Sequence, residues 1–226
     1  MEVTFYGHAC FSVNIEGRKI LFDPFITPNE LANNIDINTI EADYIFISHG
    51  HEDHVADVEK IAKKTNAIIV SNFEIVSWFN SKGLSNSHPM NHGGSWNFDF
   101  GKVKYVNAVH SSTLPDGSIG GNPGGFVIES KAGNFYFAGD TALNMDMKLI
   151  PLFTKLDFAI FPIGDNFTMG IQEAIVAADF VKVNKVMGVH YDTFGYIKID
   201  SQEAINSFKK NNLTLLLPEI GETIEI

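Results

Sequence analysis

The stretch that most constrains this chain is residues 48–54, Ser-His-Gly-His-Glu-Asp-His, which holds three imidazoles and two carboxylates. The segment 42–47 before it is short, apolar and rich in β-branched and aromatic side chains, as expected of a buried strand. After it, apolar residues recur at helical spacing from Val55 to Ala62, with charged residues on the opposite side. The stretch is therefore predicted to lie where a strand ends and a helix begins, the edge at which α/β sheets place their sites.

The composition of this stretch favours metal binding over a solvated His-rich turn. In such a tight loop His49 and His51 can turn to one side while Asp53 and His54 turn to the other, which would supply two neighbouring metal ions. Imidazole and carboxylate ligands suit Zn²⁺, and also Mn²⁺, Fe²⁺ or Ni²⁺. The zincin protease motif His-Glu-x-x-His is present only in a shortened form, because His54 comes one residue too early after His51.

Composition limits the class of protein. A chain of 226 residues with 45% hydrophobic and 19% charged residues is typical of a globular protein, and we expect one domain over residues 1–226. The net charge of -11 argues against broad binding to nucleic acid or anionic membranes. No segment approaches the roughly 18 apolar residues of a membrane span, and the start lacks a signal-peptide pattern. The single cysteine, Cys10, excludes an internal disulfide and favours a cytoplasmic location.

The rest of the chain alternates between strand meanders and strand–helix units. Short strands fill most of residues 3–24 and 95–138, and strand–helix units follow each group, up to a last predicted strand at 213–217. Residues 85–94 are polar and turn-rich, and the glycine-rich segment 114–125 is predicted to be a loop over a site. Because each half delivers polar side chains from strand ends, the pattern is consistent with two mixed sheets packed face to face with helices outside. Periodicity alone leaves α/β and α+β open.

The motif His-x-His-x-Asp-His resembles that of the metallo-β-lactamase-fold hydrolases. In that superfamily a lone His, an Asp and a final His follow the loop along the chain. Here His110, Asp140 and His190 occupy those places, each at the end of a predicted strand. Gly-Asp-Thr around Asp140 and Gly-Val-His ending at His190 are also similar to the segments of the superfamily. The resemblance implies a four-layer αβ/βα sandwich with two mixed β-sheets flanked by helices.

Residues 7–11, 23–25 and 162–170 are similar to one branch in particular, which contains ascorbate-6-phosphate lactonase and many uncharacterised metal-dependent hydrolases. The resemblance covers nearly the whole chain. It implies two divalent metal ions per chain, with Zn²⁺ expected first and Mn²⁺, Fe²⁺ or Ni²⁺ as alternatives. The implied ligands are His49, His51 and His110 for the first metal, Asp53, His54 and His190 for the second, and Asp140 as a bridge.

The resemblance and the ligand chemistry together imply a hydrolase. Many antibiotic-hydrolysing members have a cysteine where this chain has Asp140, whereas a carboxylate there resembles the thioesterase, lactonase and phosphodiesterase members. Two nearby cations lower the pKa of a shared water, so that a bridging hydroxide exists near neutral pH. We expect it to cleave an ester, lactone or phosphodiester bond of a small-molecule substrate, which can be anionic. The alternatives are a nuclease or phosphodiesterase acting on RNA or nucleotides, and a non-hydrolytic metal-dependent sensor or redox protein. A homo-oligomer is compatible with the sequence.

Two residues are candidates for a catalytic role. Asp53 can ligate a metal and also accept a hydrogen bond that orients the nucleophile. His8 shares a predicted strand face with Cys10 and Ser12, and it is either a structural histidine or a residue beside the metals. In the second case it would donate a hydrogen bond to the substrate or buttress a ligand. Asp23 is expected to start a turn or to support a ligand.

Overall fold

The computed structural model describes residues 1–226 and contains two mixed sheets of seven strands each. The first sheet has the strand order β14 (Thr223–Glu225), β1 (Glu2–Gly7), β2 (Cys10–Ile15), β3 (Arg18–Phe22), β4 (Tyr44–Phe46), β5 (Ile68–Asn72) and β6 (Ser87–Met90). The second sheet has the order β13 (Thr214–Leu216), β12 (Lys185–Val189), β11 (Phe158–Pro162), β10 (Gly133–Phe137), β9 (Gly124–Ser130), β8 (Gly101–Asn107) and β7 (Ser95–Phe98).

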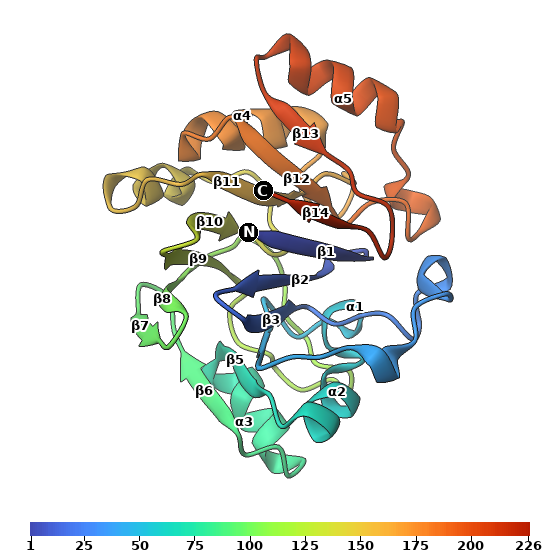
Figure 1. Cartoon of the computed structure of the whole chain (residues 1–226), viewed down its shortest axis with the longest axis vertical. Helices are drawn as coiled ribbons and strands as arrows, with labels where there is room; N and C mark the ends of the chain where they lie inside the picture. The colour runs from blue at the N-terminus through green and yellow to red at the C-terminus, as the bar shows by residue number, and fades with distance from the viewer.

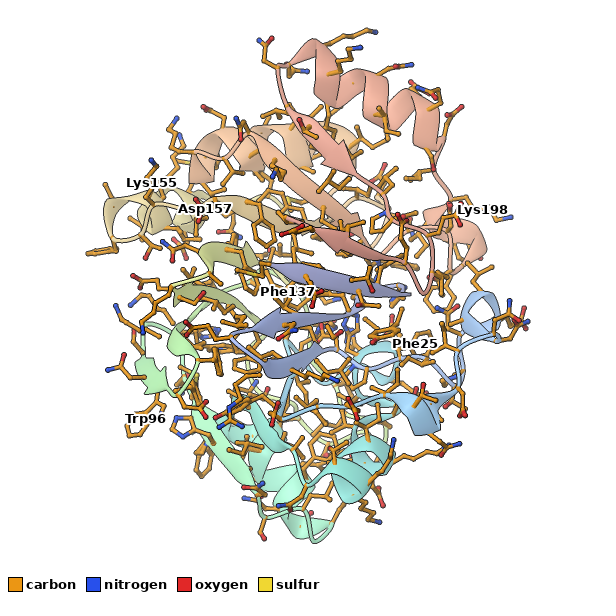
Figure 2. All side chains as sticks on the ribbon, viewed as in Figure 1. Phe25, Trp96, Phe137, Lys155, Asp157 and Lys198 are labelled. Atoms are coloured by element: carbon orange, nitrogen blue, oxygen red, sulfur yellow. The ribbon has the colours of Figure 1, made fainter.

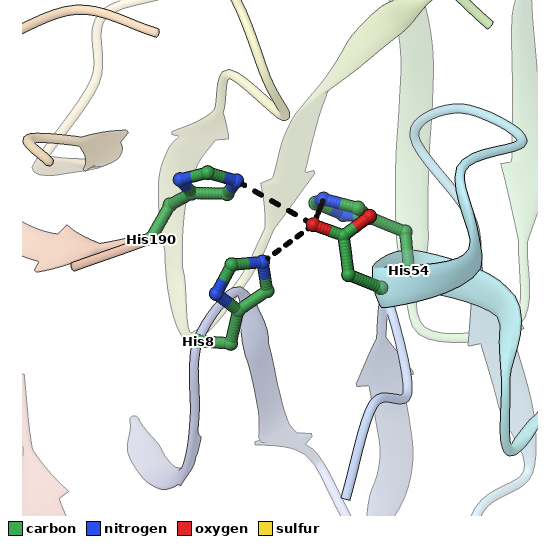
Figure 3. Close-up of side chains that lie close together, drawn as sticks. His8, His54 and His190 are labelled. Atoms are coloured by element: carbon green, nitrogen blue, oxygen red, sulfur yellow. Dashed lines mark hydrogen bonds and ion pairs between the residues drawn. The ribbon is translucent and has the colours of Figure 1, made fainter. Parts of the chain in front are cut away.

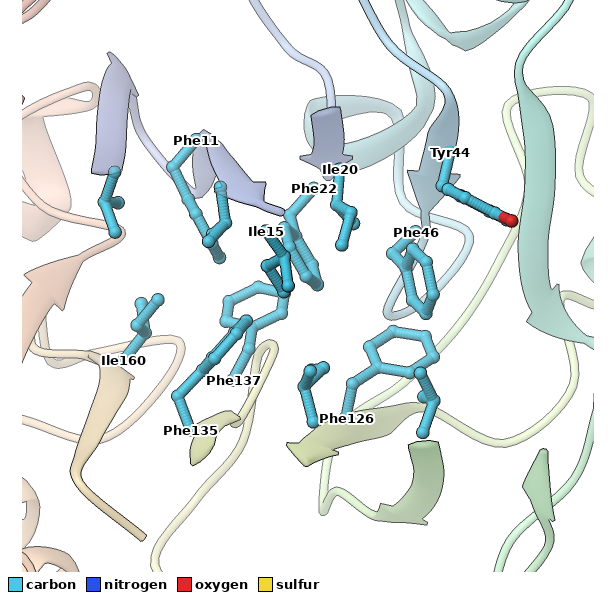
Figure 4. Packing of buried hydrophobic residues seen from close by; sticks show 14 of the residues in the cluster. Phe11, Ile15, Ile20, Phe22, Tyr44, Phe46, Phe126, Phe135, Phe137 and Ile160 are labelled. Atoms are coloured by element: carbon cyan, nitrogen blue, oxygen red, sulfur yellow. The ribbon is translucent and has the colours of Figure 1, made fainter. Parts of the chain in front are cut away.

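The two sheets pack face to face through an aromatic interior. The ring of Phe22 lies 4.6 Å from the ring of Phe11 within the first sheet. It lies 5.4 Å from the ring of Phe137, which belongs to the second sheet. Further along, the rings of Phe46 and Phe126 meet across the interface at 4.9 Å (Figure 4). Because side chains alternate between the faces of a strand, each sheet can present an apolar inner face of this kind. The aromatic interior thus fixes the distance between the two sheets.

Helices cover the outer face of each sheet. Helices α2 (Val58–Thr65) and α3 (Phe73–Ser81) pack on the first sheet, and α4 (Ile171–Val181) and α5 (Ser201–Lys210) pack on the second (Figure 1). Phe137 lies in the interior, while Trp96 and Lys155 lie at the periphery (Figure 2). The expected four-layer sandwich of two mixed sheets flanked by helices is therefore confirmed. None of the helices combines the length and the apolar composition that crossing a membrane requires.

The helix expected after residues 48–54 is split into two. A short helix, α1 (Glu52–Val55), is followed by α2, and Asp57 lies between them. The buried Asp57 carboxylate accepts hydrogen bonds from the backbone amides of Ile26 and Thr27, at 2.6 and 2.8 Å. The break therefore places a carboxylate where the loop after β3 needs an acceptor, and helical periodicity carries no signal for that requirement.

Two strands differ from the sequence prediction because both are short edge strands. Strand β6 forms within the segment predicted as turn-rich, and Pro89 is tolerated there because an edge strand has a free side. Strand β14 pairs antiparallel with β1 at the other edge of the same sheet. The remaining irregular segments hold 3₁₀ helices: η1 (Glu30–Ala32), η2 (Ile37–Thr39), η3 (Met145–Leu152) and η4 (Gly195–Ile197).

Candidate metal centre

The predicted ligands meet along one edge shared by the two sheets, where several strands end. Residues 48–51 follow β4, while Asp53 and His54 lie in α1. From the second sheet, His110 follows β8, Asp140 follows β10 and His190 follows β12. The segments that follow the strands thus carry the side chains, and the sheets hold these segments in place.

The potential ligand atoms form three groups, and within each group they lie within 4.8 Å of one another. One of them, Asp23 with His49 and His54, overlaps the other two, which hold most of the predicted ligands. The first group consists of His49, His51 and His110. The second group consists of His8, Asp53, His54 and His190. The structure thus brings together the two predicted sets of three, and it adds His8 to the second set.

Asp140 lies between the two groups. Its Oδ2 atom is 2.9 Å from Nε2 of His190 and 3.3 Å from Nε2 of His54, both in the second group. The same oxygen is 3.6 Å from Nε2 of His110 and 3.9 Å from Nε2 of His49, both in the first group. One carboxylate oxygen therefore faces imidazole nitrogens of both groups, as a bridging ligand must.

Asp23 orients two of these imidazoles. Its fully buried carboxylate lies 2.8 Å from Nδ1 of His54 and accepts a hydrogen bond from the Ser48 hydroxyl at 2.6 Å. Since that hydroxyl donates to Asp23, its oxygen accepts from Nδ1 of His49, which is 3.0 Å away. Both imidazoles therefore donate from Nδ1 and turn Nε2 towards Asp140, where a bound metal would replace any Nε2 proton. Of the two roles expected for Asp23, the contacts are those of ligand support.

Replacing Asp23 with Ala is expected to weaken metal binding by about 10–100-fold, because two ligands lose the partner that fixes their tautomer and orientation. Competition with a chromogenic chelator would measure the metal affinity. Asp36→Ala is the matched control. Asp36 lies close to Asp23 in sequence, but its carboxylate is exposed and caps η2 instead of contacting a ligand. Equal affinities for the two variants would contradict the assigned role of Asp23.

His8 is held between the two halves of the chain. It lies in the turn between β1 and β2 with a φ of 55°, so the strand parity assumed from the sequence does not apply to it. Gly7 beside it has a φ of 98°, and a Cβ there would approach Nδ2 of Asn29 to 2.7 Å. The carbonyl of His8 accepts a hydrogen bond from the amide of His190 at 2.8 Å. This backbone bond joins the first sheet to the second at the candidate centre.

The imidazole of His8 connects a ligand to a residue that the sequence analysis missed. Its Nε2 is 3.0 Å from Oδ2 of Asp53 (Figure 3). Its Nδ1 is 3.0 Å from the hydroxyl of Thr193. Burial and the adjacent His190 lower the pKa of His8 to about 4, so the ring is neutral near pH 7. A neutral ring that donates to Asp53 from Nε2 accepts the Thr193 proton at Nδ1. No sequence signal marks Thr193, because its partner is 185 positions away.

The charge and the free atoms of the site fit a cation. Burial alone would lower the pKa of His54, but the carboxylates of Asp140, Asp53 and Asp23 raise it well above its usual value. Three carboxylates around one buried imidazole therefore favour positive charge at this place. Nε2 of His54 and Oδ1 of Asp140 are buried and have no hydrogen-bond partner, so both atoms are free to ligate. Imidazole nitrogens and carboxylate oxygens are a donor set that fits a divalent transition metal.

Comparisons with known proteins agree with this fold and site. Residues 2–190 match the model of the beta-lactamase superfamily domain. The chain is 62% identical to a UPF0173 metal-dependent hydrolase of Flavobacterium johnsoniae and 58% identical to one of Christiangramia forsetii, in each case over 100% of both chains. The structure of Igni18, a metallo hydrolase from Ignicoccus hospitalis, aligns with a TM-score of 0.88 and 31% identity over 99% of this chain and 97% of that one.

Two sheets with a His- and Asp-rich edge thus define a protein of the metallo-β-lactamase fold. Identity this high over the full length of both chains narrows the assignment further. The chain belongs to the UPF0173 metal-dependent hydrolase family of the beta-lactamase superfamily.

Proposed function

We propose that this protein uses two divalent metal ions, Zn²⁺ first among them, to hydrolyse an ester, lactone or phosphodiester bond of a small molecule. The position of Asp140 carries the proposal, because one of its oxygens faces imidazoles of both ligand groups. In this proposal His49, His51 and His110 hold one ion, and Asp53, His54 and His190 hold the other. When bound, such ions lower the pKa of a water molecule and polarise the oxygen of the scissile group.

The exposure of the ligands supports attack from one side. The side chains of His54 and His190 are almost fully buried, so they would hold an ion from the protein side. The Asp53 side chain is 25% exposed and that of His110 is 15% exposed, so both reach the open side of the centre. We propose that a free oxygen of Asp53 accepts a hydrogen bond from the attacking water and orients it. The other oxygen is already occupied by His8.

His8 acts in this proposal as a positioning residue rather than through contact with the substrate. Its side chain is fully buried, and both ring nitrogens are engaged, one by Asp53 and the other by Thr193. It therefore has no free atom to offer to a substrate oxyanion. What it supplies is a fixed hydrogen bond that sets the orientation of Asp53.

Replacing His8 with Ala is expected to lower kcat by about 10–100-fold with KM and metal content little changed, since the loss falls on an interaction needed in the transition state. His8→Gln is the matched variant. The Gln amide can still donate to Asp53, and both replacements bear the same backbone strain at this position. Recovery of most of kcat by Gln supports the positioning role. Equal kcat for wild type and the Ala variant, with only a lower melting temperature, would make His8 purely structural.

A panel of substrates tests the proposed reaction itself. It consists of p-nitrophenyl esters, thioesters, lactones and bis-p-nitrophenyl phosphate, assayed with the metal-loaded protein beside single-stranded RNA. We expect turnover of one of the small-molecule classes and none of RNA, because a chain of net charge -11 repels a polyanion. Turnover of RNA alone would favour the nuclease alternative, and no turnover in any class would contradict the proposal.

A further inference from the structure

A pocket of about 580 Å³ lies beside the candidate metal centre. Three aromatic side chains contribute to its wall, together with a proline, a threonine and one carboxylate. These lining residues are Phe167, Phe194, Tyr196, Pro28, Thr193 and Glu30. The pocket is formed by the loop before α4, the loop that follows His190 and the turn before η1, so segments far apart in sequence meet there.

The pocket adjoins the proposed metal ligands through one residue. Thr193, in the pocket wall, is hydrogen-bonded to Nδ1 of His8, and Nε2 of His8 is hydrogen-bonded to Asp53. The ring of Phe194, also in the wall, lies 5.3 Å from the ring of His8. The pocket wall is therefore two side-chain hydrogen bonds away from Asp53.

The three aromatic side chains of the wall are exposed, and no other part of the chain covers them. Phe167 is 49% exposed, Phe194 37% and Tyr196 79%, and the rings of Phe167 and Tyr196 meet at 6.1 Å and 71°. The loop that carries two of them is closed by the carboxylate and the backbone amide of Asp192. Asp192, with a φ of 63°, accepts from the Ile199 amide and donates its amide to the Ile197 carbonyl. Exposed aromatic rings on a fixed loop beside a reactive centre are typical of a binding site.

The charged residues of the pocket wall disfavour one class of ligand. Glu30 is the only charged residue in the wall, and no lysine or arginine lines it. An anionic group in this pocket would lie next to a carboxylate with no lysine or arginine in the wall to balance it, whereas an uncharged ring or alkyl chain would cover the exposed aromatic faces.

We propose that this pocket binds an uncharged aromatic or aliphatic group of the substrate and so selects neutral substrates over the anionic ones that the sequence left open. The inference rests on the proposed function for the reaction, and it adds the chemical class of the group that flanks the scissile bond. The contacts of Thr193 and Phe194 with His8 place the selected group beside the residues that orient the attacking water.

Three p-nitrophenyl esters with the same leaving group test the proposal on the metal-loaded protein. They are the acetate, the phenylacetate and the anionic succinate. We expect kcat/KM to be about tenfold higher for phenylacetate than for acetate and lowest for succinate, since one apolar group in a fitting pocket gives discrimination of this order. In the double variant Phe167→Ala/Tyr196→Ala the phenylacetate-to-acetate ratio should fall towards one. Phe153 is 76% exposed on η3 at the outer face of the second sheet, and Phe153→Ala should leave the ratio unchanged.

A binding measurement separates this proposal from that of the reaction. Saturation-transfer NMR with phenylacetamide, which lacks a reactive ester, should give a signal with wild type and Phe153→Ala and at least a fivefold weaker one with the double variant. Binding of phenylacetamide without hydrolysis of any ester would support the proposed role of the pocket and contradict the proposed hydrolytic function. Hydrolysis with the same phenylacetate-to-acetate ratio in all three proteins would support the hydrolytic function and overturn the proposed role of the pocket. A preference for the succinate ester would do the same.

Discussion

Replacing Asp140 with Asn is expected to remove one metal ion per chain and to lower any hydrolytic rate by about a thousandfold or more. One oxygen of this carboxylate faces imidazoles of both groups, so the change removes a negative charge from the point where two cations would meet. The loss of several kcal/mol of transition-state stabilisation corresponds to a rate change of this size. Asn is nearly the same size as Asp, so the fold should be retained.

Elemental analysis and kcat measured on the same preparation test this expectation. Asp146→Asn is the control, because it makes the same chemical change at an exposed position. Asp146 lies six residues after Asp140, in η3. Circular dichroism would establish that both variants are folded. Two metal ions and full activity in Asp140→Asn would show that this carboxylate does not bridge.

Removal of the metals is expected to abolish hydrolysis and to lower the melting temperature. Protein purified without a chelator should hold two divalent ions per chain, because the structure offers two groups of ligands with Asp140 between them. The ligands extend from His49 to His190, so the unfolded chain cannot gather them. Ions that bind only the folded state stabilise it by about 4 kcal/mol when their free concentration is 1,000 times Kd.

Elemental analysis, followed by calorimetry before and after treatment with a chelator, would measure both effects. Adding Zn²⁺ or Mn²⁺ to the stripped protein should restore the melting temperature and the activity together. A ratio of one ion per chain that does not rise when either metal is added would contradict the two-metal proposal. An unchanged melting temperature would show that the ligands are held in place by the fold alone.

The resemblance implied the candidate ligands, and the sequence could place them at one edge because the segments that carry them follow recognisable strands. His110, Asp140 and His190 come after apolar runs, and a chain with two such sheets delivers strand ends to one edge. The contact between His8 and Thr193 could not be predicted, since neither periodicity nor spacing relates residues 185 positions apart. The strand parity assumed for His8 was wrong because the residue has left-handed backbone geometry in a turn.

The elements that the sequence missed lack an apolar signal of their own. Strand β6 is polar and contains Pro89, and it forms because β5 offers a free edge. Strand β14 forms because β1 offers the opposite edge. The break at Asp57 serves a loop elsewhere in the chain. In each case the deciding partner is distant in sequence, and local preference gives way to it.

The backbone hydrogen bond from His190 to His8 has a consequence for how molecules reach the centre. The two sheets are joined by a backbone hydrogen bond at the point where the proposed ligands of one ion meet. We therefore expect no hinge opening between the sheets at this point. Changes in access to the centre must then come from loops and side chains, such as the loop that carries Phe194 and Tyr196, rather than from the sheets.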